Sequence, residues 1–149
     1  MLAAALTTVA LLPGLLTPTV TEVKDKTPLR VLLPSSFKTD EPTLFASGDG
    51  SRRDYQISVS TVKDCGANAC SLAFFSAYKG QKLYGTRKVT LAQGRKGRYL
   101  PLSCGGSCSP PSVQWVEKGV LYEIQMDFEQ NARAELVKMA NSAIRHGAR

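Results

Sequence analysis

Residues 112–126, SVQWVEKGVLYEIQM, decide how this chain folds. Two apolar-rich runs flank Lys118–Gly119, and a glycine at this place lets the chain turn back on itself. In the second run Tyr122, Ile124 and Met126 alternate with polar residues, which is the period of a strand with one buried face. The stretch therefore predicts a β-hairpin.

The sequence that follows this hairpin has the period of a helix. Leu136, Met139, Ala140 and Ala143 follow one another at intervals of three, one and three residues, so they share one side of a helix. We expect an amphipathic helix over about 131–144. The simplest role for its apolar side is to pack on the sheet rather than on a membrane or a partner.

Strands also dominate the sequence before the hairpin. Residues 71–78, SLAFFSAY, are apolar on both faces and predict a central strand, while the alternation in 55–60 predicts a half-buried one. The other expected strands are 30–33 and the pair 87–92 and 98–103, which form a hairpin around 93–97. Strand after strand followed by one helix predicts an α+β fold. Its main part is an antiparallel sheet, with the C-terminal amphipathic helix packed on one face.

The N-terminal third divides into three expected parts. Residues 1–21 hold a short apolar run and read as a signal peptide or membrane-targeting segment, since a membrane span needs about 20 apolar residues. A buried helix of the domain is the alternative for this run. Residues 22–29 read as a polar linker, and 30–149 as one domain. Within it, 35–53 reads as a long loop that turns at 48–50.

The cysteines agree with export. Four occur in two short motifs, Cys65 and Cys70 in CGANAC and Cys104 and Cys108 in CGGSC. An even number behind an export signal indicates two disulfides in an oxidising compartment. Their spacings differ from the C-x2-C of zinc knuckles and of thiol oxidoreductases. Three pairings are possible, and the glycines within each motif favour pairing within it.

The charge of the chain is uneven. The net charge is +7, and no acidic residue occurs between Asp64 and Glu117. The basic residues of this stretch are Lys79, Lys82, Arg87, Lys88, Arg95, Lys96 and Arg98. A region of one sign attracts anions, so these residues are candidate contacts for an anionic polysaccharide or for lipid headgroups. The alternative is that they only keep an exposed hairpin soluble and unpaired.

Three aromatic residues are candidate ligand contacts. Tyr84 and Tyr99 lie among the basic residues, and Trp115 is the only tryptophan. On an exposed strand their rings would stack on a sugar or another ring. Burial in the core is the alternative for Trp115, since a lone tryptophan in a small domain is mostly buried.

The sequence offers little for catalysis. Its only histidine, His146, lies at the expected end of the last helix, where the helix dipole favours the charged imidazolium over a general base. No motif has the spacing of a metal site or a phosphate-binding loop, so we expect no metal and no cofactor. We also expect no specific nucleic-acid partner. These patterns favour a non-catalytic role over an enzymatic one.

The last third of the chain resembles known bacterial domains. The positions that carry the resemblance are Trp115, Glu117, Gly119, Tyr122 and Ile124, followed by the helix ELVKMANSAI at 135–144. They resemble the closing segment of exported domains of unknown function, some of which occur in cell-envelope stress regulators and lipoprotein-carrier-like proteins. The stretches CGANAC and CSPPSVQW are similar to small secreted cyanobacterial proteins without an assigned function. The resemblance implies an extracytoplasmic sheet capped by a C-terminal helix, and no catalytic residue.

Together these observations predict a protein that is exported to the periplasm or the medium, or is tethered outside the membrane by an uncut leader. We expect a non-catalytic cell-envelope domain that binds an anionic component through its basic hairpin. The alternative is a small hydrolase that acts on cell-envelope polymers.

Overall fold

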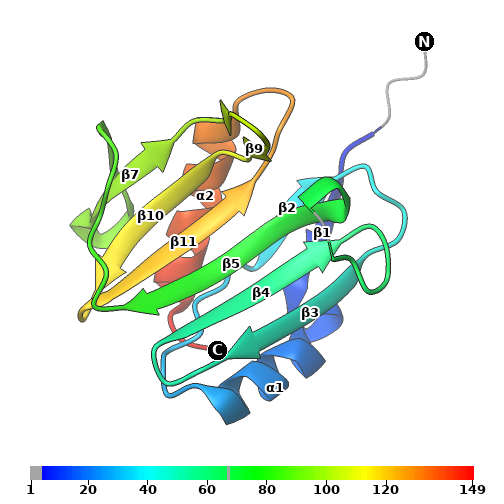
Figure 1. Cartoon of the computed structure of the whole chain (residues 1–149), viewed down its shortest axis with the longest axis horizontal. Helices are drawn as coiled ribbons and strands as arrows, with labels where there is room; N and C mark the ends of the chain where they lie inside the picture. The colour runs from blue at the N-terminus through cyan, green and yellow to red at the C-terminus, as the bar shows by residue number, and fades with distance from the viewer. Residues whose placement is uncertain (1–4, 67) are drawn as a thin grey trace.

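A seven-stranded antiparallel sheet forms the centre of the molecule, and two helices pack on one side of it (Figure 1). The structure, a computed structural model, describes residues 5–66 and 68–149. The helices are α1 (Thr17–Lys26) and α2 (Ala132–His146). The strands of the main sheet are β3 (Phe45–Gly50), β4 (Asp54–Ser60), β5 (Ser71–Lys79), β6 (Arg87–Thr90), β7 (Lys96–Leu100), β10 (Ser112–Glu117) and β11 (Val120–Met126).

Two small sheets flank this centre. One pairs β1 (Thr7–Ala10) with β2 (Ser36–Thr39), and the other pairs β8 (Ser103–Cys104) with β9 (Cys108–Ser109). Short helical turns occupy Leu11–Leu15, Asn68–Cys70 and Ala92–Gly94. The α+β class predicted from the sequence is confirmed.

The order of the strands across the sheet is β3-β4-β5-β11-β10-β7-β6. Strands β3, β4 and β5 form one run of neighbours, and β6, β7, β10 and β11 form another. The two runs meet where β5 pairs with β11, so the apolar strand β5 is central, as its sequence predicts. Both expected hairpins form: Trp115 lies opposite Tyr122, and Lys88 lies opposite Arg98.

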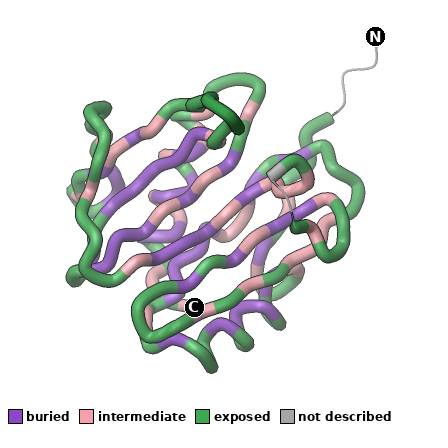
Figure 2. Tube along the Cα trace, viewed as in Figure 1, coloured by how far each residue is buried: buried purple, intermediate pink, exposed green. Residues whose placement is uncertain are grey.

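One face of the sheet is covered by the helices. A row of directly opposed apolar residues crosses its middle, namely Val113, Ile124, Phe75 and Ile57. The buried side chains of α2 that pack against this face include Leu136, Met139, Ala140 and Ala143, which confirms the predicted apolar side of the helix. Figure 2 shows buried positions alternating with more exposed ones along the strands.

The other helix packs on two glycines. Val23 of α1 lies against Gly48 of β3, where a Cβ atom would lie 2.8 Å from Val23 Cγ2. Gly50 similarly faces Thr27, just beyond the end of α1. The glycines that predict a turn within 35–53 are therefore strand residues that let a helix approach closely, and the expected loop holds β2 and β3. The expected linker 22–29 is in large part the second half of α1, because Val20 and Val23 give it a buried side.

The expected first strand, 30–33, does not join the main sheet. Only Leu32 forms a bridge, and its partner is Ala148 near the C-terminus. The segment is buried instead between other elements: the Tyr55 hydroxyl accepts a hydrogen bond from Leu32 N, and the Tyr122 hydroxyl donates to Arg30 O. Its apolar side chains pack in the core, although its backbone is not paired as a strand of the main sheet.

The expected leader contributes to the core. Leu11 and Leu16 are completely buried, and Leu11 N donates to Ser35 O. This packing matches the alternative interpretation of the run, a buried segment of the domain. Among the described residues, no helix has the length and apolar character that crossing a bilayer requires.

The two disulfides have the pairing that the sequence favours. Cys65 is bonded to Cys70, and Cys104 to Cys108, so all four cysteines are paired. Disulfides persist in oxidising compartments, which the pairing therefore indicates for this protein.

Candidate ligand-binding face

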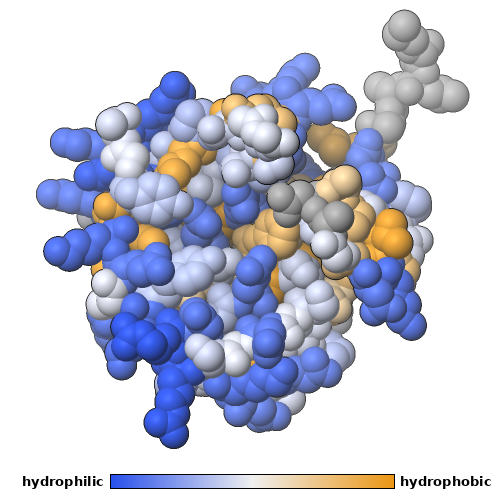
Figure 3. Space-filling model, in the orientation of Figure 1, coloured by the Kyte–Doolittle hydropathy of each residue, from blue (hydrophilic) through white to orange (hydrophobic). Residues whose placement is uncertain are grey.

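The face of the sheet opposite to α1 and α2 carries no helix, and we call it the open face. Figure 1 views the molecule from this side, with α2 behind the sheet. In the space-filling view of the same side, hydrophilic residues dominate and apolar surface is confined to separate patches (Figure 3). Because the side chains of a strand alternate between faces, these residues are the neighbours in sequence of those in the core.

One row of directly opposed polar residues crosses all seven strands of the open face. We call this the central row, and its members in strand order from β6 to β3 are Lys88, Arg98, Gln114, Glu123, Ser76, Gln56 and Asp49. Adjacent strands lie about 4.8 Å apart, so the row is about 29 Å long. It begins with two cations, holds the Glu123 carboxylate near its middle and ends with Asp49, which forms an ion pair with Lys26.

The middle of the row is a buried hydrogen-bonded cluster. Gln114 Nε2 donates to Glu123 Oε2 at 2.6 Å, and Ser112 Oγ donates to the same oxygen at 3.1 Å. Gln114 is only 1% exposed, and its Oε1 atom has no hydrogen-bond partner among the described residues. A buried acceptor without a donor costs about 1–3 kcal/mol, so this oxygen is an unusual feature for a folded core.

A loop between β5 and β6 lies over this cluster. It crosses the open face because β5 and β6 are separated by three other strands, and its Gly85 lies against the side chain of Leu100. The loop places Tyr84 beside Gln114 and Glu123, with 54% of the residue still exposed. Partial burial, and then the Glu123 carboxylate, raise the pKa of Tyr84, so its hydroxyl stays protonated at neutral pH.

The cations of the acid-free stretch do not all gather on this face. Three of them lie on the open face, namely Lys88, Lys96 and Arg98. Lys88 and Arg98 belong to the central row, and Lys96 belongs to the next pair of β6 and β7 that points to the same face. We call these three residues the cationic edge. Lys82 is exposed on the crossing loop. Lys79 is the last residue of β5 and Arg87 is the first residue of β6. Both are exposed, and their positions in the strands correspond to the face that the helices cover.

Arg95 is not available as an anion contact. Its Nε atom donates to Glu117 Oε1, and Arg30 Nη1 lies 3.4 Å from the other oxygen of the same carboxylate. Glu117 is buried, so it requires these positive partners. Arg95 is the only one of the seven predicted cations with an ion pair among the described residues, and it belongs to the support of the fold.

Only one of the three candidate aromatic residues is exposed. Trp115 is fully buried and stacks on Tyr122, with ring centroids 5.6 Å apart, so its ring has no face open to a ligand. Tyr99 is buried on the covered face, where the Arg133 guanidinium lies 5.9 Å from its ring centroid. Tyr84 therefore remains as the ring that can stack on a ligand.

The only histidine lies beside a serine. His146 Nε2 is hydrogen-bonded to Ser35 Oγ, which also accepts a hydrogen bond from Arg149 Nη2 at 3.4 Å. A hydroxyl next to an imidazole is the arrangement of a nucleophile and its base. Among the described residues, however, no carboxylate is hydrogen-bonded to the second ring nitrogen to orient it.

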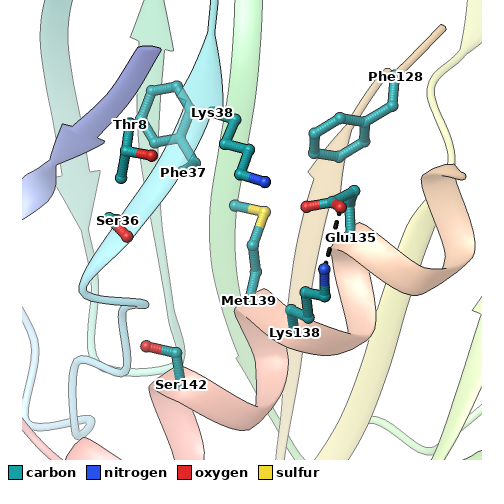
Figure 4. A pocket seen from close by; sticks show the side chains of 9 residues that line it. All are labelled: Thr8, Ser36, Phe37, Lys38, Phe128, Glu135, Lys138, Met139 and Ser142. Carbon is teal, nitrogen blue, oxygen red and sulfur yellow. Dashed lines mark hydrogen bonds and ion pairs between the residues drawn. The ribbon is translucent and has the colours of Figure 1, made fainter. Parts of the chain in front are cut away.

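Two of the hollows formed by the described residues lie outside the open-face cluster. The first, about 150 Å³, lies between β2 and α2, and its walls include Phe37, Phe128 and Met139 (Figure 4). Lys138 and Glu135 at its rim pair with each other at 3.3 Å. This volume is below the roughly 300–1,000 Å³ of common small-molecule sites.

The second hollow lies at the turn between β3 and β4 and holds two carboxylates, Asp49 and Asp54. Lys26 donates to Asp49 at 2.8 Å and lowers the pKa of Asp49, so this carboxyl is ionised and unsuited to act as a general acid. Asp54 accepts a hydrogen bond from Ser51 at 2.7 Å within the turn. Both carboxylates therefore already have a hydrogen-bond partner within the fold.

No known protein family, no curated protein and no solved structure shows significant similarity to this chain. Within the described part of the chain, no three His, Cys, Asp or Glu side chains come together in a metal-binding arrangement. The sequence did not single out Gln114 and Glu123, although their alternation with Trp115 and Tyr122 places them together on the opposite face. Their residue types are ordinary for an exposed strand, and only the crossing loop makes them a buried cluster.

Proposed function

We propose that this protein is a non-catalytic, extracytoplasmic domain that binds an acidic polysaccharide of the cell envelope through its cationic edge. The observation that carries the proposal is that Lys88, Lys96 and Arg98 lie on one face without an ion-pair partner among the described residues. Unpaired cations at this spacing create a positive potential that attracts a linear anion. Lys82 on the crossing loop adds to this potential.

A polysaccharide fits this face better than a lipid surface does. The residues next to Arg98 on the neighbouring strands are polar, namely Gln114, Ser112 and Glu123, and the apolar Val116 on the same face of β10 is only 37% exposed. A lipid-binding surface would carry apolar side chains there, to enter the acyl region beside the headgroups. Polar side chains instead match the hydroxyl groups of sugars.

The test measures retention on an immobilised acidic polysaccharide and on anionic phospholipid vesicles at increasing salt. The double variant Lys88→Glu with Lys96→Glu should lose retention on the polysaccharide. The matched control, Lys24→Glu with Lys63→Glu, changes the net charge equally at exposed positions elsewhere and should keep it. Retention of the wild type should fall steeply as salt rises, because the screening length drops below about 8 Å above physiological strength.

Two results would contradict the proposal. If the wild type shows no salt-sensitive retention on the polysaccharide, the cationic edge only serves solubility. If retention occurs on vesicles alone, the partner is a lipid surface and the polysaccharide is wrong.

We also propose that the protein is exported with residues 11–26 retained in the folded domain. The two disulfides support export, and the complete burial of Leu11 and Leu16 supports retention. N-terminal sequencing of protein from the periplasm or the medium tests this. Protein that begins near Thr21, as a cleaved leader would leave it, would contradict retention.

A small hydrolase acting on envelope polymers is the second candidate function, and the contact between Ser35 and His146 favours it. A fluorophosphonate probe, which labels activated serines, would label the wild type and neither Ser35→Ala nor His146→Gln. Absence of labelling in the wild type would remove this candidate.

A further inference from the structure

We propose that Tyr84, Gln114 and Glu123 form a subsite for one sugar unit of the polysaccharide, with Tyr84 as the stacking ring and the other two as hydroxyl acceptors. This inference rests on the proposed function, because it names the part of the acidic polysaccharide that the open face recognises. The cationic edge supplies attraction for its acid groups, and this subsite supplies recognition of its hydroxyls.

The first argument comes from the unpartnered acceptor. Gln114 Oε1 is buried and lacks a donor, while Nε2 of the same amide is fixed on Glu123 Oε2 at 2.6 Å. That bond sets the orientation of the amide and holds Oε1 as an acceptor. A ligand hydroxyl that donates to Oε1 would remove the cost of the missing hydrogen bond, and a ligand without a hydroxyl would not.

The second argument comes from the position of Tyr84. Its side chain lies next to both Gln114 and Glu123, and about half of it remains open to solvent. The loop that carries it has Gly80 and Gly85 in left-handed backbone conformations, with φ of 79° and 89°. Because Gln114 Oε1 is buried in the free protein, the proposal requires this loop to move so that an entering sugar can reach both Oε1 and the Tyr84 ring.

The third argument is the order of the central row. Arg98 lies directly opposite Gln114 on the neighbouring strand, and Lys88 lies directly opposite Arg98. Opposed residues lie about 5 Å apart, which is close to the length of one sugar unit. A sugar that stacks on Tyr84 and binds Gln114 would therefore present an acid group, its own or its neighbour's, to Arg98.

The experiment compares binding of acidic oligosaccharides with binding of their carboxyl-methylated forms, which have the same hydroxyls and no charge. Calorimetric titration of the wild type should show tight binding of the acidic form and weaker binding of the methylated form. Tyr84→Ala should weaken both forms about tenfold. Gln114→Leu, which keeps the approximate size of the side chain and removes both the free acceptor and the donor to Glu123, should weaken both about fivefold.

Two controls keep the result specific. Ser47→Ala changes an exposed residue of the same face on the far strand β3 and should leave both affinities unchanged. Tyr84→Phe keeps the ring and should retain most of the binding that Tyr84→Ala loses. Thermal unfolding of each variant establishes that it is folded.

The outcomes separate this inference from the proposed function. If Lys88→Glu with Lys96→Glu abolishes binding of the acidic form while Tyr84→Ala and Gln114→Leu change nothing, the cationic edge is correct and the subsite is wrong. If the Tyr84 and Gln114 variants weaken the methylated form and the charge variant leaves the acidic form unchanged, the subsite is correct and the cationic edge is wrong. If the wild type binds neither form, both proposals are overturned.

Discussion

Gly48 of β3 and Val23 of α1 lie in such close contact that any side chain on Gly48 would overlap the helix. A Cβ atom at Gly48 would lie 2.8 Å from Val23 Cγ2 and 2.9 Å from Thr19 Cγ2. The distance between helix and sheet is therefore set by the absence of a side chain. This contact joins the N-terminal segment to the edge of the sheet.

We expect Gly48→Ala to destabilise the protein by about 1–3 kcal/mol, because one added methyl group in a well-packed contact forces backbone or side chains to shift. Urea denaturation measures the free energy of unfolding. Gly105→Ala is the matched control, since a Cβ there meets nothing within 4 Å. Equal stabilities of the two variants would show that α1 does not pack on β3 as described.

Leu16→Ala tests whether the N-terminal segment belongs to the core. Leu16 is completely buried, so its truncation should cost about 2–5 kcal/mol. Leu6 is 65% exposed, and Leu6→Ala should change the free energy of unfolding by less than about 0.5 kcal/mol. A surface-like effect at Leu16 would mean that the segment is detached in solution.

Leu136→Ala tests the docking of α2. Leu136 is fully buried against the sheet, and we expect a loss of about 2–5 kcal/mol in urea denaturation. Arg145→Ala, at an exposed position of the same helix, should have little effect. If the two variants lose equally little, the apolar side of α2 is free to bind a partner instead.

Each disulfide closes a short loop and should contribute about 2 kcal/mol by restricting the unfolded chain. The double variants Cys65→Ala with Cys70→Ala, and Cys104→Ala with Cys108→Ala, should each lower stability by this amount. Peptide mapping without reduction should find only these two pairs. A peptide that links Cys65 to Cys104 or Cys108 would disprove the pairing.

Two buried tyrosines should make the protein sensitive to alkali. Burial, and then the Glu117 carboxylate, raise the pKa of Tyr122 to about 12, and burial also raises the pKa of Tyr55. An unfolded tyrosine has a pKa of about 10, so above this pH the unfolded state loses protons that the folded state retains. The contribution of Tyr122 is complete below pH 10 and is lost as the pH rises from about 10 through 12, and that of Tyr55 also falls as the pH rises above 10.

Unfolding free energies measured across this pH range should therefore fall with rising pH. Tyr122→Phe should make the fall shallower, because phenylalanine has no proton to lose. Phenolate absorbance should show Tyr55 titrating only as the protein unfolds. A stability that is constant from pH 10 to 12 would contradict the burial of these hydroxyls.

The elements with a strong period were predictable from the sequence, and those held in place by distant parts were not. The alternation in β11 and the spacing of Leu136, Met139 and Ala140 are local patterns, and both gave the observed element. Gly48 and Gly50 led to the prediction of a turn, which was wrong. Their role is to let α1 pack closely on β3, and this depends on a segment far from them in sequence. The burial of Leu16 depends in the same way on contacts that no local pattern contains.

The candidate site shows the same division. The cations were visible as an acid-free stretch, but the sequence did not place Arg95 against Glu117, which removes it from the surface. The cluster of Gln114 and Glu123 was missed, because it is buried only where the crossing loop returns over β10 and β11. Trp115 and Tyr99 were candidates by residue type, and their register placed both on the covered face.

The pairing of β5 with β11 has a consequence for how the chain is made. During synthesis β3, β4 and β5 leave the ribosome as one meander, and β11 follows only after β6, β7 and β10. Until then β5, apolar on both faces, has one edge of unpaired backbone groups, which invites aggregation with other chains. Closure of the sheet must await a late, long-range contact, and contacts of this kind slow folding. A nascent chain of this protein would thus benefit from a chaperone that shields β5 until β11 has emerged.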